Sequence, residues 1–532
     1  MSGVDQFELV LALLMVTVLL STVAHRIHLP PAAAFVLGGM ALAVIPGTPA
    51  FEVNPALIMV LFLPPLLQSS AFLTSWRDFR SQMRRILMLA VGAVAFTTFA
   101  VGWVAKLVMP DLSWAACFAL GAIVSPPDAV SAKAVLQGLR LPRRLVTILE
   151  GESLVNDASG LVLYRFAVVA ALSGTFNAGE AALSFVGLAV GGIMVGAVFG
   201  YAINLVYRRM RDPFHVVISS FLVGWTSYIV ADRLQVSGVL SVVTCGLIMG
   251  WYQHDLLTAQ TRMQAMAVWR MVEFVLEALV FVLIGLSLRG VLARMGMMDA
   301  AFGVAIPLTL TVTAAVIVSR FVWVYAMVYL PRLSPAVRRR TPGPPSSVAF
   351  IASWAGMRGV VSLAAALALP AGFPGRDDIL LATFGVILAT VLLQGTTLGP
   401  LARALRLTAI VEKEETLTEH AARAHVFAAS ADWLERVTDP ETGVVVHPML
   451  LNEYRARARA TTRMVEDQEG TQPRRHAHFD MALQVVAVGR AELIKLHRAG
   501  RIHESVLQGI EAEFDLEELR LRRLGGFEAG GH

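Results

Sequence analysis

The sequence has little charge. Of its 532 residues only 16% are Asp, Glu, Lys or Arg, whereas 56% are apolar and the mean hydropathy is +0.65. Soluble domains typically have about 25% charged and 45–50% apolar residues. This composition excludes a soluble globular protein and a disordered chain, and two cysteines are too few for a disulfide scaffold. Long apolar runs indicate instead an all-α polytopic membrane protein with a soluble part attached.

Histidine and cysteine are scarce in the apolar part. Eight of the twelve histidines follow residue 406, and none of the other four lies deep in an apolar run. Cys117 and Cys245 do lie in apolar runs, where we expect them as small buried side chains. These patterns disfavour haem and metal centres, and we expect no cofactor. Most of the basic excess lies between apolar runs, so the pI near 9.4 predicts membrane orientation rather than a nucleic-acid partner.

The apolar runs predict thirteen transmembrane helices, since a helix needs about 20 apolar residues to cross a bilayer. The expected ranges are 7–24, 31–47, 54–73, 86–109, 113–136, 145–172, 181–206, 214–231, 237–252, 268–290, 300–330, 345–370 and 378–402. The connections are alternately rich and poor in Lys and Arg, except near Arg289 and Arg294. The positive-inside rule then places the N-terminus outside and the C-terminus in the cytoplasm, in the cell (inner) membrane.

The charge balance changes near residue 406. Residues 1–406 contain 28 Lys and Arg against 18 Asp and Glu, whereas residues 407–532 contain 16 against 21. The second part has charged amphipathic patterns separated by turn-forming segments, which is typical of soluble helices. We therefore expect a transmembrane domain over 1–406 and a helical cytoplasmic tail over 407–532. Regulation, dimer contact and simple capping of the membrane part all stay open as roles for the tail.

Ionisable residues at mid-bilayer depth are costly and usually functional, and here they gather in few spans. Span five contains the run SPPDAV, in which Pro126 and Pro127 remove two amide donors. This run predicts a broken helix with Asp128 at the break, because irregular backbone at this depth is tolerated only inside protein or beside a wet cavity. A structural proline kink with a capping Asp128 is the alternative.

Span six has the densest group of polar residues. Glu152 and Asn156, and likewise Ser153 and Asp157, are four residues apart and so share helix faces. Hydroxyl, amide and carboxylate oxygens are the ligands that hard cations prefer, and the same carboxylate accepts a proton. The pattern predicts that Asp157 binds either a cation or a proton in competition. A purely structural polar network between helices is the alternative.

A second interruption is expected in span twelve, where Gly356 and Gly359 flank Met357 and Arg358. Arg358 would neutralise either the carbonyl end of a half-helix or a carboxylate. Spans five and twelve are the middles of two oppositely oriented triplets, which is typical of an inverted-repeat transporter with its site at the midplane.

Two more acidic residues, Glu273 and Glu277, share a face near the cytoplasmic start of span ten. They would either line a cytoplasmic funnel or cap and pair at the helix start. The sequence slightly favours the structural role.

Four runs in order, SPPDAV, EGESLVNDASGLVLYRFA, LVFVLIGL and SWAGMRGVVSLA, resemble the monovalent cation:proton antiporters of the Na+/H+ exchanger (NhaP-like) family over about residues 7–405. The resemblance implies a Na+/H+ antiporter that exchanges one cation for one proton by alternating access, for pH and sodium homeostasis. It also implies a homodimer, with a dimerisation part over about 7–73 and 181–290. A transport core over about 86–172 and 300–402 would move in an elevator-like way.

The resemblance also assigns roles to single residues. Asp157 matches the ion-binding aspartate, Asp128 the aspartate of the unwound span five, and Asn156 a position typical of the electroneutral branch. The expected ligands of Na+ or another monovalent cation are Asp157, Asp128, Ser153 and Asn156. The expected charge partners are Glu152 with Arg320 of span eleven, and Arg358 of the unwound span twelve.

Two positions depart from the family pattern. Pro127 precedes Asp128 and Ala129 follows it, where members often have Thr and Pro, which puts a backbone carbonyl ligand in doubt. Gln68 and Ser69 stand where some members have a Glu, so a third site carboxylate is not expected in span three.

Three other functions compete with Na+/H+ exchange. K+ in place of or beside Na+ stays open, because oxygen ligands bind both ions. A cation channel also uses carboxylates and broken helices, and is the more distant alternative. A membrane-embedded hydrolase is disfavoured, because span six offers Ser153 but no intramembrane histidine as a base.

Overall fold

The computed structural model is built of helices, which confirms the expected all-α class. It describes residues 3–27, 29–45, 55–128, 142–174, 178–210, 212–294, 299–333, 343–370, 372–405, 419–439, 441–466, 472–499, 501 and 504–525. Within these ranges the β-type pairing is limited to an isolated antiparallel bridge between Thr438 and Val445. The chain divides into two compact units, Met1–Glu412 and Lys413–His532.

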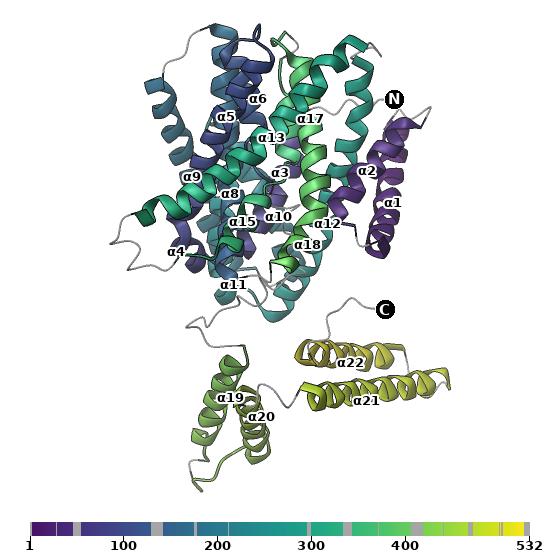
Figure 1. Cartoon of the computed structure of the whole chain (residues 1–532). Helices are drawn as coiled ribbons and strands as arrows, with labels where there is room; N and C mark the ends of the chain where they lie inside the picture. Colours follow the sequence, from purple (N-terminus) through teal and green to yellow (C-terminus); the bar gives the residue numbers. More distant parts are fainter. Residues whose placement is uncertain are drawn as a thin grey trace. The chain divides into compact units, whose positions relative to one another are not determined.

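Helices of the first unit occupy every range in which a membrane span was expected (Figure 1). The first group comprises α1 (Gly3–Ile27), α2 (Pro31–Val44), α3 (Pro55–Leu73), α4 (Trp76–Leu87), η1 (Met88–Ala93), α5 (Val94–Val108), α6 (Trp114–Val124) and α8 (Arg143–Ser173). The next comprises α9 (Ala178–Tyr207), α10 (Pro213–Arg233), α11 (Gly238–Leu256) and α12 (Ala259–Arg294). The last comprises α13 (Asp299–Tyr329), η2 (Leu330–Leu333), α15 (Ser346–Trp354), α16 (Val360–Leu367), α17 (Arg376–Ala389), η3 (Thr390–Gln394) and α18 (Gly395–Ala404).

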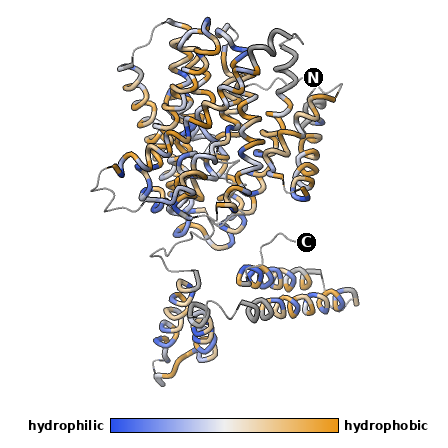
Figure 2. The backbone as a smooth tube through the Cα atoms, viewed as in Figure 1, coloured by the Kyte–Doolittle hydropathy of each residue, from blue (hydrophilic) through white to orange (hydrophobic). Residues whose placement is uncertain are grey.

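The helices of this unit are apolar over most of their length (Figure 2). Among the described residues, six stretches are long and apolar enough to cross a membrane, and four shorter apolar helices accompany them. The six are Trp76–Val108, Arg144–Ser173, Ala182–Tyr207, Pro213–Arg233, Ile306–Leu333 and Arg376–Ala404. A multi-pass membrane fold follows from these stretches, whereas the count of thirteen crossings stays a prediction.

Two of the expected spans contain non-helical backbone within their ranges. α6 ends at Val124, where the two prolines that follow cannot supply amide donors to continue the helix. The expected second half of this span, from residue 129 to 136, lies outside the described residues. α15 ends at Trp354 and α16 begins at Val360, so residues 355–359 form a second non-helical segment.

Packing places both interruptions inside the bundle. α6 packs against α5 and α8, and α13 packs against α5, α15 and α17 while running obliquely across the bundle (Figure 1). An apolar core joins these helices through residues such as Leu120, Ile123, Leu308 and Val386. α2 packs on α12, α9 on α11, and α10 and α11 on α3. Non-helical backbone therefore lies among protein side chains rather than in lipid.

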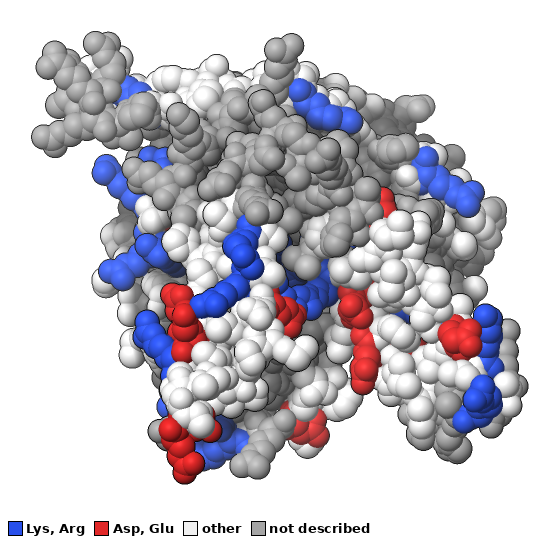
Figure 3. All heavy atoms as spheres, turned by 90° about the horizontal axis from the view of Figure 1, so that it is seen from below, with Lys and Arg blue, Asp and Glu red and all other residues white. Residues whose placement is uncertain are grey.

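The second unit contains two helical hairpins. Its helices are α19 (Glu419–Arg436), α20 (Pro448–Glu466), α21 (Gln472–Arg498) and α22 (Glu504–Gly525). α19 packs on α20 around Ala431, Leu434 and Leu451, and α21 packs on α22. Lys and Arg as well as Asp and Glu side chains are visible in the view from below (Figure 3), and the helices of this unit are more polar than those of the first (Figure 2).

Candidate cation site

The non-helical segments of spans five and twelve meet at Asp128. The backbone N–H of Asp128 donates a hydrogen bond of 2.7 Å to the carbonyl of Met357. Its carboxylate lies so close to Gly359 that a Cβ atom at that position would overlap Oδ2 of Asp128. Gly359 immediately precedes α16, so the Asp128 carboxylate lies at the N-terminal end of that helix, where peptide dipoles carry partial positive charge.

The opposite, C-terminal ends of the half-helices are each bound by a buried arginine. The Arg358 guanidinium donates to the carbonyl of Ser125, which directly follows α6. Arg320 of α13 donates to the carbonyl of Ala352 in the last turn of α15, with Nε at 3.2 Å and Nη2 at 3.1 Å. Because helix C-termini carry partial negative charge and unpaired carbonyls, each guanidinium stabilises a helix end inside the bundle.

Glu152 of α8 forms a bidentate ion pair with Arg320. Nη1 of Arg320 lies 2.6 Å from Oε1 of Glu152, and Nη2 lies 2.9 Å from Oε2. Both side chains are about 97% or more buried. Arg320 therefore joins α8, α13 and α15 at one point, and its charge is compensated by a carboxylate as well as by a carbonyl.

Asn156 holds α8 against the break in span five. Its Nδ2 donates a hydrogen bond of 2.5 Å to the carbonyl of Pro127, while its buried Oδ1 has no hydrogen-bond partner among the described residues. The Pro127 carbonyl, whose position the sequence left in doubt, is thus engaged by an amide. Asn156 does not line the cavity described next, although the sequence reasoning placed it among the cation ligands.

A cavity of about 50 Å³ lies between α3, α8, α12 and the two breaks. Its oxygen-bearing lining residues are Ser70, Asp128, Ser153, Asp157, Glu277 and Ser362. The Ser362 hydroxyl is buried and has no hydrogen-bond partner in the described part of the chain. The volume fits a small ion with a water molecule, and the oxygens are of the type that hard cations prefer.

Asp157 is the most secluded carboxylate of the cavity, with 8% of the residue exposed. Among the described residues, no hydrogen bond or ion pair with its side chain is formed. Asp128 and Ser153 line the same cavity, from the break in span five and from one turn earlier in α8. Since a buried charge requires a partner, this carboxylate is suited to take up either a cation or a proton.

Three oxygen-bearing cavity residues, Ser70, Glu277 and Ser362, were not among the expected site residues. Glu277 lines the cavity, although the sequence slightly favoured a structural role for it, and Ser70 was not considered. Glu273, one turn before Glu277, accepts a hydrogen bond of 2.6 Å from Ser69 and so joins α12 to α3. The spacing of Glu273 and Glu277 indicated that they share one face of the helix. A single sequence does not show which neighbouring helix that face contacts.

Arg165, further along α8, lies away from this site. Arg165 is 3.6 Å from Asp232 of α10, and both side chains are about half exposed. Gln68 of α3 donates to Sδ of Met249 at 3.0 Å instead of reaching the cavity.

Non-helical segments that meet beside a carboxylate cavity, inside a bundle of apolar helices, are typical of a membrane transporter. A family model described as the transmembrane sodium/hydrogen exchanger matches residues 10–404. The chain therefore belongs to the sodium/hydrogen exchanger family.

Named relatives agree with this assignment. An uncharacterized Na+/H+ exchanger of Mycobacterium tuberculosis is 33% identical, covering 96% of this chain and 95% of that protein. The Na+/H+ antiporter NhaP of Pseudomonas aeruginosa is 32% identical over 77% of this chain and 99% of its own length. The fold is similar to that of the sodium proton antiporter MjNhaP1 from Methanocaldococcus jannaschii, with a TM-score of 0.61 and 18% identity over 76% of this chain and 99% of that one.

Proposed function

We propose that the chain exchanges one Na+ for one H+ by alternating access at a single site, in which Asp157 is the shared carrier. The observation that carries the proposal is that Asp157, Asp128 and Ser153 line one small cavity where the non-helical segments of two spans meet. Relatives named as Na+/H+ antiporters support the choice of ions. The chain would then act as a secondary transporter and not as an enzyme.

The division of labour follows from the contacts. Asp157 binds the cation or the proton, with Asp128 and Ser153 as further oxygen ligands of the cation. Asn156 acts indirectly, by holding the Pro127 carbonyl and with it the segment that carries Asp128. The pair Glu152–Arg320 and the contact of Arg358 with Ser125 fix the ends of the half-helices, so that the cavity keeps its shape as ions enter and leave.

The protein as a whole is proposed to be a homodimer in the cell membrane, with its N-terminus outside and its C-terminus in the cytoplasm. Within each protomer, helices around α6, α8, α13 and α16 would form the moving transport core, and α1–α3 with α9–α12 the dimerisation part. The helix contacts support this division. Within the proposed dimerisation part, α2 packs on α12 and α9 packs on α11. Within the proposed core, α5 packs on both α6 and α13.

K+/H+ exchange is the second candidate. A relative in Bacillus pumilus named as a sodium, potassium, lithium and rubidium/H+ antiporter is 31% identical over 79% of this chain and 64% of its own length. Oxygen ligands do not by themselves separate these ions. Proton flux driven by Na+, Li+ or K+ in turn, measured on the purified protein across a range of pH, would rank them.

The central test is transport in proteoliposomes by the Asp157→Asn variant. We expect cation-dependent proton flux to be abolished, because the amide binds neither a proton nor a cation with comparable strength. Asp232→Asn, an exposed aspartate on α10, is the matched control and should transport normally. Sustained flux in Asp157→Asn would remove Asp157 from the mechanism.

Two further measurements separate exchange from its rivals. One-for-one exchange moves no net charge, so an imposed membrane potential should leave the rate nearly unchanged. Unitary currents, or cation flux without proton counter-flux, would identify a channel instead.

A further inference from the structure

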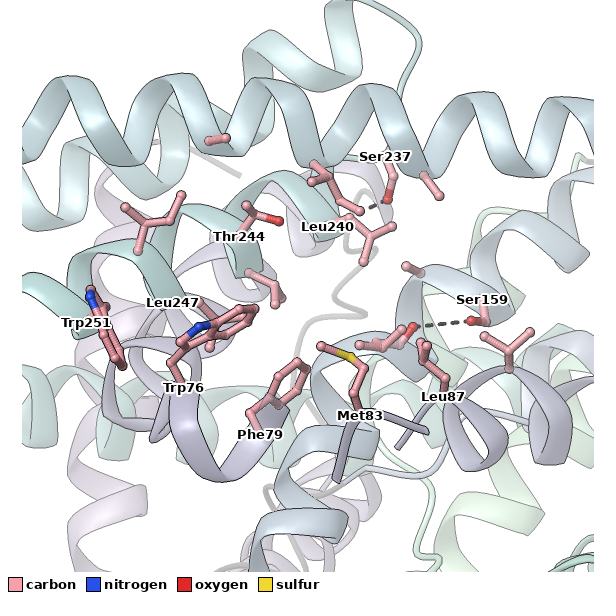
Figure 4. Close-up of a pocket in the computed structure, with 18 of the residues that line it drawn as sticks. Trp76, Phe79, Met83, Leu87, Ser159, Ser237, Leu240, Thr244, Leu247 and Trp251 are labelled. Atoms are coloured by element: carbon pink, nitrogen blue, oxygen red, sulfur yellow. Dashed lines mark hydrogen bonds between the residues drawn. The ribbon is translucent and has the colours of Figure 1, made fainter. Parts of the chain in front are cut away.

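A second, much larger cavity lies within the membrane unit, away from the cation site. Its volume is about 550 Å³, and its walls are α4, α8, α9 and α11 (Figure 4). α9 packs on α11 and α4 packs on α8, so the cavity is a cleft between these two pairs of helices. Trp76, Phe79 and Met83 of α4 face Leu247 and other α11 side chains across it.

The cleft is long, narrow and apolar. Its α9 wall is a stripe in which every fourth residue faces inward: Phe185, Ala189, Ile193, Ala197 and Tyr201. Its α11 wall extends from Ser237 to Tyr252, which at 1.5 Å per residue is about 20 Å along the helix axis. This exceeds one half of a hydrocarbon core about 30 Å thick, the depth that an acyl chain of one leaflet occupies.

One end of the cleft is lined by amphipathic aromatic residues. Trp76, Tyr201, Trp251 and Tyr252 lie at the ends of α4, α9 and α11 that the proposed orientation places at the cytoplasmic surface. Tyr201 is 57% exposed and Trp251 53% exposed, so the cleft is open at this end. Aromatic rings with polar tips are typical of the membrane–water interface, where they contact lipid ester groups.

Basic side chains border the same end. Successive residues of α4 are rotated by about 100° around the helix axis. This rotation places Arg80, Arg84 and Arg77 on the side of α4 next to the face that lines the cleft. Asp78 lies on the opposite side. Arg208 directly follows α9, and its backbone N–H still donates to the carbonyl of Asn204. It therefore lies two turns after Tyr201, on the cleft side of this helix end. These arginines form no ion pair within the described part of the chain, and those of α4 are exposed.

We propose that this cleft is a binding site for an anionic phospholipid of the cytoplasmic leaflet, with an acyl chain between α9 and α4–α8 and its phosphate held by the arginines of α4 and α9. Charge complementarity selects this ligand, because an apolar slot that ends in aromatic residues and unpaired arginines matches a lipid with a negative headgroup. The assignment rests on the orientation proposed above, but not on the identity of the transported ion.

The test measures lipid binding to the purified, delipidated full-length protein by native mass spectrometry, with phosphatidylglycerol and phosphatidylcholine as probes. We expect phosphatidylglycerol to bind more tightly. The Arg80→Gln/Arg84→Gln variant should weaken its binding by at least about tenfold, since each basic residue near an anionic headgroup contributes about a factor of five. The matched control is Arg26→Gln/Arg403→Gln, which removes two exposed arginines from the ends of α1 and α18 and should bind normally.

A second pair of variants tests the acyl-chain slot. Ala197→Trp fills the cleft from α9 and should reduce binding of both lipids, whereas Met194→Trp, on the exposed face of the same helix, should not. Equal binding of the two lipids, unchanged binding in Arg80→Gln/Arg84→Gln, or unchanged binding in Ala197→Trp would each overturn the proposal. Asp157→Asn should bind lipid normally, so a failure of the lipid site and a failure of the transport site are distinguishable.

Discussion

The carboxylate of Asp128 lies against the α-carbon of Gly359, in the space that a side chain would need. This contact joins the breaks of two helices that are more than 200 residues apart in the chain. It also brings the carboxylate to the N-terminal end of α16 and into the cation cavity. The site is thus built where the two interruptions meet, and either break alone would not form it.

Gly359→Ala should therefore impair exchange. The added methyl group must displace Asp128, and overpacking of this kind costs about 1–3 kcal/mol. If this free-energy cost applies only to the cation-bound state, the affinity for Na+ decreases roughly 5- to 150-fold. The apparent KM for Na+ in proteoliposomes measures the effect. Gly187→Ala, in α9 where a Cβ meets nothing within 4 Å, is the control and should behave like the parent protein.

The ion pair Glu152–Arg320 should respond differently to single and double substitution. Glu152→Gln leaves the Arg320 charge buried without a carboxylate, and breaking a buried pair in this way costs about 3–5 kcal/mol. The double variant Glu152→Gln/Arg320→Gln should be less destabilised than the sum of the two single variants. Thermal unfolding of the detergent-purified protein gives the comparison.

An exposed pair supplies the reference for that experiment. Arg165→Gln removes a partner from the half-exposed pair with Asp232 and should change stability by about 0–1 kcal/mol. If Glu152→Gln were equally mild, the buried pair would not hold α8 and α13 together.

Competition at Asp157 predicts how exchange depends on pH. When most sites are protonated, each unit decrease in pH should raise the apparent KM for Na+ by up to about tenfold, because the cation must then displace a proton from the same carboxylate. Rates of Na+-driven proton flux at several pH values measure this slope. Ser153→Ala should raise KM at every pH without altering the slope, since the hydroxyl binds only the cation. A KM that does not change with pH would mean separate sites for the two ions.

The tail contains a pH-sensitive turn. The Asp439 carboxylate accepts hydrogen bonds from the backbone N–H groups of Thr442 at 3.0 Å and Glu441 at 2.8 Å, and these bonds lower the pKa of Asp439. Because the folded-state pKa is below the unfolded value, the turn is fully stabilised above the ordinary aspartate pKa and loses this contribution as the pH falls through the lowered one.

Amide hydrogen exchange at residues 441–444 tests this prediction. Protection should decrease in acid in the parent protein but stay nearly constant in Asp439→Asn, whose uncharged side-chain oxygen accepts the same bonds. Equal acid sensitivity in both proteins would show that another group controls the turn.

Much of the fold could be predicted because membrane helices are encoded locally. The length of an apolar run fixes a helix, and Pro126–Pro127 and the glycines around Arg358 mark where helices stop. Which faces meet is not local information. The exclusion of Asn156 from the cavity depends on a contact with Pro127, 29 residues away, and the presence of Glu277 there depends on how α12 packs against α3 and α8.

The buried Arg320 and Arg358 affect whether the proposed core can move without a bound ion. Among the described residues of the proposed moving core, the charged groups in or beside the cavity are Asp128, Glu152, Asp157, Arg320 and Arg358. Three negative and two positive charges sum to −1, so this core is neutral only when it carries one monovalent cation or one proton. Glu277 belongs to α12, on the wall proposed to stay fixed. An empty core would have to carry its unbalanced charge through the bilayer, where such charges are strongly disfavoured. Slippage without cargo would thereby be suppressed, and each outward step would have to be matched by a loaded return.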